Sequence, residues 1–137
     1  MTVKDYLSQA RYLDDRINAK IRQVESLSAL ATSATSALTG MPRNPSKATS
    51  KMADIVDKIV DLQAEINADI DTLVDLKREI SHMIKSVPNP EYQTILERRY
   101  LCFDNWEKIA AEMGYELRYL FKLHGKALDA ITQALSS

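Results

Sequence analysis

The stretch that decides the fold is residues 105–128, which read NWEKIAAEMGYELRYLFKLHGKAL. Apolar residues recur at helical spacing in a short run before Gly114 and in a longer run after it. A glycine suits the left-handed conformation that follows many helix C-termini, so the first helix is predicted to end at Met113. The second helix is predicted from about residue 116 to residue 135. The stretch therefore predicts two helices joined by a tight turn, which is the spacing of a helix-turn-helix motif.

A small core should hold this pair of helices together. Asp104 and Glu107 form a D-x-x-E pattern, close to a capping box, at the start of the first helix. Trp106 is predicted to be buried against Tyr100 and the final helix, because a large aromatic side chain anchors a small core well. The residues expected to pack between the two helices are Ile109, Ala110 and Met113 with Leu120, Leu123 and Ala127.

A further helix is predicted upstream, after the sequence VPNPEYQ at residues 87–93. Pro88 should end the preceding helix. Asn89 is suited to cap a new helix that has Pro90 at its first position. Residues 88–137 are therefore predicted to form a three-helix module.

Residues 51–87 carry apolar side chains at heptad spacing, which is typical of a coiled coil. A helix of this length spans roughly 55 Å and needs a partner along its length. Asp69 interrupts the pattern: it is either turned outward, with Ile70 in its place, or it sets the register as a buried polar group. The two apolar series are Met52, Ile59, Ile66, Leu73, Ile80 and Val87, and Ile55, Leu62, Leu76 and Met83.

An amphipathic pattern also covers residues 3–31, where Thr2 is suited to cap the helix. Residues 32–50 are rich in Ser, Thr and Ala and contain a glycine and two prolines, so a flexible connection with residual helix at its edges is predicted there. The first helix can then fold back on the second. Residues 1–87 are therefore predicted to form a long antiparallel helical hairpin.

The apolar surface of the second long helix is wider than one folded-back helix needs to cover. Val56, Ile70 and Ile84 extend this surface onto a neighbouring face. The chain is therefore expected to associate with itself, as a dimer or higher oligomer, through residues 1–87.

The composition agrees with an all-α fold, because only three glycines and four prolines stand against 45% hydrophobic residues. The predicted fold class is all-α: a long, coiled-coil-like N-terminal hairpin followed by a three-helix helix-turn-helix module. Cys102 is the single cysteine, so no intramolecular disulfide can form. No apolar run approaches the roughly 18 residues of a membrane span, and the N-terminus lacks a leader-like apolar segment. A cytoplasmic protein without a membrane partner is expected.

Charge gives a weaker indication of function. The formal net charge is -1, and residues 88–137 carry 6 Lys and Arg against 7 Asp and Glu. A dedicated DNA-binding module usually has a basic footprint. This balance therefore favours protein contacts over DNA contacts for the C-terminal module.

Catalytic and metal chemistry find little support in the sequence. Glu79 and His82 form an E-x-x-H pattern of the kind that binds iron in helical bundles, but such a site needs a second copy and two further carboxylates. A solvated helix face is the preferred interpretation. No Gly-rich phosphate loop, nucleophile elbow or Cys/His cluster is present. We therefore expect no catalytic residue, no metal or cofactor and no small-molecule substrate.

The C-terminal module resembles region 4, the DNA-binding module of bacterial sigma factors. The resemblance covers residues 90–131: an L-x-x-R-Y helix, a Glu-x-Ile-Ala helix, a Gly turn, and a last helix that ends in K-A-L. The whole chain is similar to a family of prophage proteins of Gram-positive bacteria, which resembles phage late-gene transcription activators of the ArpU and RinA type. The matching residues are Leu96, Arg99 and Tyr100, then Trp106, Glu107, Ile109 and Ala110, then Gly114, and finally Lys126, Ala127 and Leu128.

The resemblance implies that the first turns of the last helix read double-stranded DNA, with RNA polymerase as a further candidate partner. An Arg can bond guanine through two hydrogen bonds, and a Phe can contact a thymine methyl group. The implied DNA-binding residues are Glu116, Leu117, Arg118, Phe121 and Lys122.

The sequence and the resemblance together favour one function, with a second as the alternative. The first is a phage-encoded, DNA-binding transcriptional regulator that oligomerises through its N-terminal helices. The second is a structural or scaffolding coiled-coil protein whose C-terminal module contacts protein. Sigma factors usually place Ser or Thr at the cap of the reading helix and polar residues after it, whereas this chain has Glu116, Leu117 and Phe121 there. These departures favour the second function.

Overall fold

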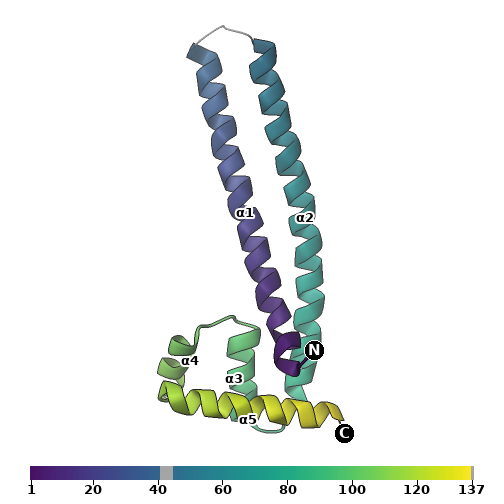
Figure 1. The fold of residues 1–137 in the computed structure, drawn as a ribbon, viewed down its shortest axis with the longest axis vertical. Coiled ribbons are helices and arrows are strands. Elements are labelled where there is room, and N and C mark those ends of the chain that lie inside the picture. Colours follow the sequence, from purple (N-terminus) through teal and green to yellow (C-terminus); the bar gives the residue numbers. More distant parts are fainter. Residues whose placement is uncertain (41–44, 137) are drawn as a thin grey trace. The chain divides into compact units, whose positions relative to one another are not determined.

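A computed structural model describes the backbone of residues 1–40 and 45–136 and the side chains of residues 1–33 and 50–136. The described residues form five α-helices and no strand, which confirms the predicted all-helical class. The helices are α1 (Val3–Gly40), α2 (Pro45–Lys85), α3 (Pro90–Tyr100), α4 (Trp106–Met113) and α5 (Leu117–Ser136) (Figure 1).

The two long helices extend further than the sequence indicated. Residues 32–40 continue α1 and residues 45–50 begin α2, within the segment predicted to be a flexible connection. Alanine is the best helix former, and proline is tolerated at the first position of a helix, where Pro45 lies. The turn expected near Pro42 lies outside the described residues.

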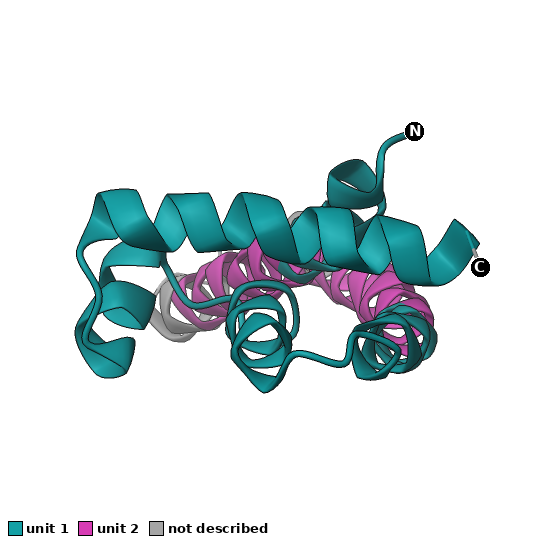
Figure 2. Cartoon of the chain, turned by 90° about the horizontal axis from the view of Figure 1, so that it is seen from below, with its two compact units in different colours: residues 1–14, 73–137 teal, residues 15–72 magenta. Residues whose placement is uncertain are grey.

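The chain divides into two compact units (Figure 2). One unit comprises residues 15–72. The other joins residues 1–14 to residues 73–137, so it contains α3, α4 and α5 together with one end of each long helix. The ends of α1 and α2 thus belong to the same compact unit as the three short helices.

Residues 15–72 bury a narrow apolar seam. Leu62 and Ile66 on α2 and Ile17 on α1 are buried at heptad positions. Lys20 Nζ lies 2.6 Å from Asp69 Oδ2, and both side chains are less than one-fifth exposed. Asp69 is therefore not turned outward: it contacts α1, as a residue that sets the register would.

Some apolar residues on α2 lie outside the seam. Val56 is 48% exposed, Val60 57% and Ile70 41%, all within residues 15–72. Ile84, which was expected to extend this exposed face, is fully buried in the other unit. The expectation for Ile84 was wrong, because burial in this part of α2 extends beyond the two heptad series.

Side chains at the helix starts determine where the short helices begin. Asn89 caps α3: its Oδ1 accepts hydrogen bonds from the amides of Glu91 and Tyr92, with Pro90 at the first helical position, as predicted. The cap of α4 is Asn105, whose Oδ1 accepts from the Lys108 amide at 2.8 Å. The cap therefore lies one residue after Asp104, and the N3 position holds Lys108, so the predicted D-x-x-E capping box does not form.

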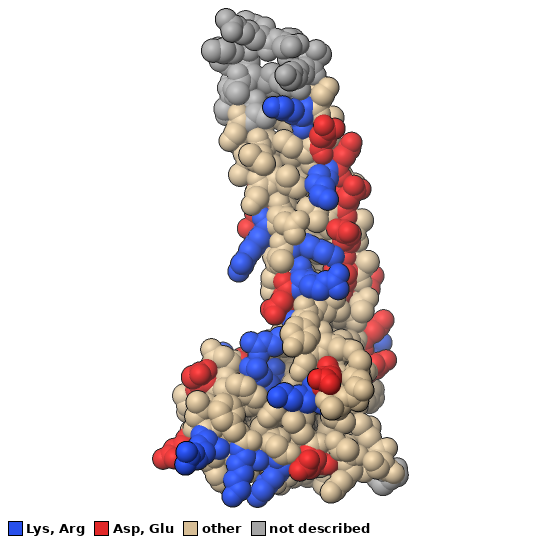
Figure 3. Space-filling view, in the orientation of Figure 1, with Lys and Arg blue, Asp and Glu red and all other residues tan. Residues whose placement is uncertain are grey.

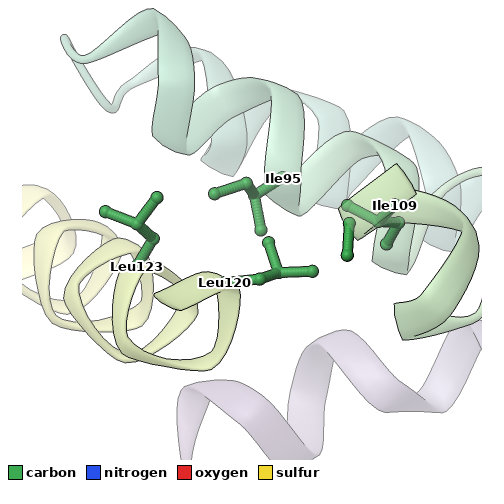
Figure 4. Packing of buried hydrophobic residues seen from close by; sticks show 5 residues of the cluster. Ile95, Ile109, Leu120 and Leu123 are labelled. Atoms are coloured by element: carbon green, nitrogen blue, oxygen red, sulfur yellow. The ribbon is translucent and has the colours of Figure 1, made fainter. Parts of the chain in front are cut away.

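The core of the three short helices is small and fully closed. Ile95 from α3, Ile109 from α4 and Leu120 from α5 are each 0% exposed and point toward one another (Figure 4). Ala110 and Leu123 complete the cluster, and Met113 packs against it. The predicted packing of α4 on α5 is confirmed for these residues. Ala127 is also buried on α5.

Candidate nucleic-acid interface

The turn between α4 and α5 has the geometry that its glycine predicts. Gly114 adopts φ 74°, in the left-handed region. The amide of Tyr115 donates to the Ala110 carbonyl at 2.9 Å, which closes the end of α4 as in a Schellman motif. The Leu120 amide donates to the Glu116 carbonyl at 3.0 Å and begins the first turn of α5. The turn between α4 and α5 thus consists of Gly114, Tyr115 and Glu116.

Polar contacts tie this turn to α3. Arg98 on α3 forms an ion pair with Glu112 on α4. The hydroxyl of Tyr115 donates to Glu91 Oε2 at 2.7 Å, and this hydrogen bond raises the pKa of Tyr115. With the closed core beneath, these contacts give the first turns of α5 a defined position relative to α3 and α4.

Arg118 and Lys122 are exposed on one face of α5. They are four residues apart, so their side chains lie one above the other on the helix. Lys126 continues the same face by another turn and is also exposed. Lys126 was not among the DNA-binding candidates predicted from the sequence. Its spacing of four residues from Lys122 could have identified it as the third cation of this row.

The other three candidate residues lie elsewhere on α5. Leu117 is 36% and Phe121 46% exposed, and they lie on a face beside that of the cationic row. The Phe121 ring meets the Trp106 ring edge-on, with 5.4 Å between centroids. Glu116 is exposed and precedes the first residue of the helix. The five predicted residues therefore form an apolar pair, a cationic pair and a carboxylate before the helix.

Trp106 is half-buried rather than enclosed. Its ring lies edge-on to His124, with 4.5 Å between centroids, and the guanidinium of Arg99 stacks over it at 4.5 Å. The contact with the final helix is as predicted. Tyr100, the other expected neighbour, lies in ring contact with His124 instead.

Next to Trp106, Tyr100 and His124 form a buried polar pair that no sequence pattern predicted. Tyr100 Oη and His124 Nε2 are 2.7 Å apart, and both residues are buried. Burial lowers the pKa of His124 to about 4, and the positive charges of Lys4 and Arg99 act in the same direction. Burial raises the pKa of Tyr100 to about 12, against an opposing effect of Arg99. Both groups are therefore uncharged near neutral pH.

The distribution of charge over this unit is mixed. Figure 3 shows Lys and Arg side chains gathered over the part of the molecule that α3, α4 and α5 form, with acidic side chains among them. Two of the acidic groups on this unit are already engaged, because Glu112 pairs with Arg98 and Glu91 accepts from Tyr115. The Glu112–Arg98 pair removes one charge of each sign and the Glu91 carboxylate keeps its charge, so these contacts leave the charge balance of the unit unchanged.

Glu79 of the E-x-x-H pattern takes part in a contact between α1 and α2. Glu79 accepts a hydrogen bond from the Tyr6 hydroxyl, and this bond raises the pKa of Tyr6. Within the part of the chain that the structure describes, no group of three or more His, Cys, Asp or Glu side chains is arranged to hold a metal ion. Among the same residues, no helix is both long and apolar enough to cross a membrane.

Comparison with known protein families, with curated proteins and with solved structures gives no significant match.

Proposed function

We propose that this protein is a DNA-binding transcriptional regulator without catalytic activity, of the phage type that the sequence resemblance implies. In this proposal α4, the Gly114 turn and α5 form a helix-turn-helix, and α5 enters the major groove. Residues 1–87 form an antiparallel hairpin through which copies of the chain associate. The protein acts in the cytoplasm, and RNA polymerase is a candidate partner.

The observation that carries the proposal is the row of cations on α5. Arg118, Lys122 and Lys126 are exposed on one helix face that begins directly after a closed, tight turn. A reading helix needs side chains of this kind at its N-terminal turns, held by a rigid support. Gly125 lies on the same face and is exposed, and no atom lies within 4 Å of the place that a Cβ would take there. A phosphate backbone could therefore approach the helix closely at this glycine.

Two contacts between α1 and α2 support the antiparallel hairpin. Within residues 15–72, Lys20 of α1 contacts Asp69 of α2. Within the other unit, Tyr6 of α1 contacts Glu79 of α2. Residues earlier in α1 therefore meet residues later in α2, as in an antiparallel pair.

Self-association is supported by the apolar residues that the seam leaves exposed. Val56 and Val60 lie one turn apart on α2, and Ile70 follows on the same side two heptads after Val56. A second copy of the chain could cover this stripe. Association would raise affinity for DNA, because two modules that are linked bind two half-sites together more tightly than either binds alone.

Fluorescence anisotropy with duplex DNA from upstream of the protein's own gene neighbourhood tests DNA binding. Arg118→Ala should weaken binding to the preferred site by about 1 to 3 kcal/mol and relax its specificity. Lys122→Ala should weaken binding to all duplexes about equally and reduce the salt slope by about one. Lys108→Ala is a matched control, because Lys108 is an exposed cation on α4 outside the row. Equal effects of all three substitutions would contradict a reading role for α5.

Sedimentation equilibrium tests the association. The double variant Val56→Gln, Val60→Gln keeps the charge unchanged and places polar groups on the exposed stripe. It should shift the protein toward monomer and weaken DNA binding, with helix content retained. A full-length protein that is monomeric at roughly tens of micromolar would remove the basis for a dimeric regulator.

A scaffolding role is the second candidate, and one observation favours it. Leu117 and Phe121 are both at least one-third exposed and lie one turn apart on the same face at the start of α5. Exposed aromatic and aliphatic residues in one place are typical of protein contacts. If the full-length protein shows no salt-dependent binding to any duplex at low ionic strength, this second function replaces the first.

A further inference from the structure

A cavity of about 560 Å³ lies within the unit of residues 1–14 and 73–137. Its size falls within the range of small-molecule sites, roughly 300 to 1,000 Å³. Three cationic side chains line it: Lys4 and Arg11 from the start of α1, and Arg99 from α3. None of the described residues that line the cavity is an Asp or a Glu. The cavity is therefore a concentration of positive charge on a chain with a net charge of -1.

Arg11 gives the cavity a hydrogen-bond donor that lacks a partner among the described residues. Its Nη1 atom is buried and has no hydrogen-bond partner in the described part of the chain. A buried donor left without a partner is costly, and more so when it is charged. The cavity therefore contains a donor for which an anion is a suitable partner.

The pKa shifts of two groups in the cavity show the influence of these cations: Arg11 acts on Arg99, and Lys4 and Arg99 both act on His124. The pKa of Arg99 is lowered by burial and by the charge of Arg11, against opposing effects of Tyr100 and Glu107. Lys4 and Arg99 both contribute to the low pKa of His124. Three positive charges that lie this close together are stabilised when an anion binds between them.

The rest of the cavity wall is aromatic. Trp106 and Phe121 meet edge-on, and Tyr12, Tyr100 and His124 also line the space. Arg99 already stacks on the Trp106 ring at 4.5 Å, which shows that this wall accepts a planar group. Planar aromatic ligands bind to such walls by stacking.

We propose that this cavity binds a nucleoside phosphate, with the phosphate between Lys4, Arg11 and Arg99 and the base against the aromatic wall around Trp106. A phosphate alone would leave the aromatic wall uncovered. A neutral aromatic compound would leave the Arg11 donor without a partner. A nucleotide combines the two requirements in one molecule of suitable size.

The site combines residues of α1 with Phe121 of α5. A ligand bound there would contact the helix proposed to read DNA, so binding could alter the position of its first turns. The inference goes beyond the proposed DNA-binding function and does not depend on it, because its main determinants, Arg11 and Lys4, lie on α1.

Isothermal titration of the full-length protein with nucleoside monophosphates tests the proposal. Trp106 is the only tryptophan, so its indole N–H resonance in the NMR spectrum reports on the same cavity. A monophosphate should bind saturably and shift this resonance, whereas the unphosphorylated nucleoside and inorganic phosphate should each bind more weakly. Arg11→Gln should reduce affinity by about tenfold or more, the loss expected for a charge-assisted hydrogen bond.

Arg78→Gln is the matched control, because Arg78 is an exposed arginine of the same unit that does not line the cavity. It should leave nucleotide binding unchanged. Lys4→Gln provides a second test at an exposed position, so a folding defect of the Arg11 variant would not leave the proposal undecided.

The inference would be overturned if no mononucleotide bound saturably at millimolar concentration. Equal nucleotide binding by the Arg11, Lys4 and Arg78 variants would also overturn it. So would binding of single-stranded oligonucleotides without binding of free nucleotides. The last result would assign the cavity to nucleic acid. Failure of duplex binding leaves the titration unaffected, so the two proposals can fail separately.

Discussion

The paired helices of residues 15–72 and the three short helices of the other unit bury their side chains in different ways. In the part of α2 that lies within residues 15–72, burial follows the heptad, and Val60, outside the seam, is 57% exposed. In the three-helix core, Ile95, Ile109 and Leu120 are 0% exposed. Two helices can cover only one stripe of each other, whereas a third helix closes the space from another side.

The polar contacts differ in the same way. The Lys20–Asp69 pair lies at the edge of the seam and remains partly in contact with solvent. The Tyr100–His124 pair is buried at the wall of the cavity, and its members remain uncharged. A two-helix seam can therefore use charge to select its register, whereas the closed core accommodates polar groups only in neutral, hydrogen-bonded form. This difference fits the proposal that recognition belongs to the three-helix unit and association to the paired helices.

The largest expected effect tests whether the two regions lose structure separately. Leu120→Ala removes a fully buried side chain from the centre of the three-helix core. It should destabilise α3, α4 and α5 by about 3 to 5 kcal/mol. Residues 15–72 should retain their helices, as measured by hydrogen exchange resolved to individual amides. Leu117→Ala, at a 36% exposed position on the same helix, is the control and should cost less than about 1 kcal/mol. Uniform loss of protection along the whole chain would show that the regions fold as one.

The next test concerns the charge in the seam. Asp69→Ala leaves Lys20 partly buried without its partner and should cost about 1 to 3 kcal/mol in urea unfolding. The double variant Lys20→Met, Asp69→Leu should recover that stability but allow more than one helix register or oligomer. Arg78→Ala should change stability by less than about 0.5 kcal/mol, because its contact with Asp75 is exposed. If Asp69→Ala also has no effect, the pair does not contribute to the seam.

A smaller effect should appear with pH in the three-helix unit. The pKa of His124 is about 4 in the folded protein against 6.5 ordinarily, so the unfolded chain binds the proton more readily. Stability should be fully present above pH 6.5 and fall as pH decreases toward 4. We expect a loss of about 1 to 2 kcal/mol, less than the full pKa difference implies, because the adjoining cavity admits solvent.

Urea unfolding at several pH values measures this loss. His124→Phe removes the titrating group, so the difference between wild type and variant should change as the pH is lowered through this range, with the wild type losing more stability. A constant difference would mean that His124 does not account for the pH dependence.

The smallest effects compare two glycines. Gly114 has a positive φ, so Gly114→Ala should cost about 1 to 2 kcal/mol even though nothing lies within 4 Å of the added carbon. Gly125 lies inside α5, also with open space around it, so Gly125→Ala should stabilise by about 0.5 to 1 kcal/mol. Thermal unfolding should therefore shift in opposite directions for the two variants. A shift in the same direction would contradict the requirement for glycine at the left-handed position 114.

Local features of the chain were predictable because they depend on residues close together in sequence. The Asn89 cap, the Gly114 turn and the apolar faces of α2 and α5 each follow from the intrinsic geometry of helices and their ends. The Asp104 prediction failed for a similar local reason: Asp104 and Asn105 are both good caps, and a pattern does not distinguish neighbours. The row Arg118, Lys122 and Lys126 was also available from spacing alone.

Contacts between distant residues were decided only by the tertiary structure. The sequence left two orientations open for Asp69, and its contact with Lys20, 49 residues away, selects one. Nothing near His124 indicates that Tyr100 is its partner. The cavity joins Arg11 to Trp106, and the orphan Nη1 atom of Arg11 exists only because the two segments pack together. Helix periodicity determines which face of a helix is buried, but burial, charge and pKa at a site depend on which other segments that face meets.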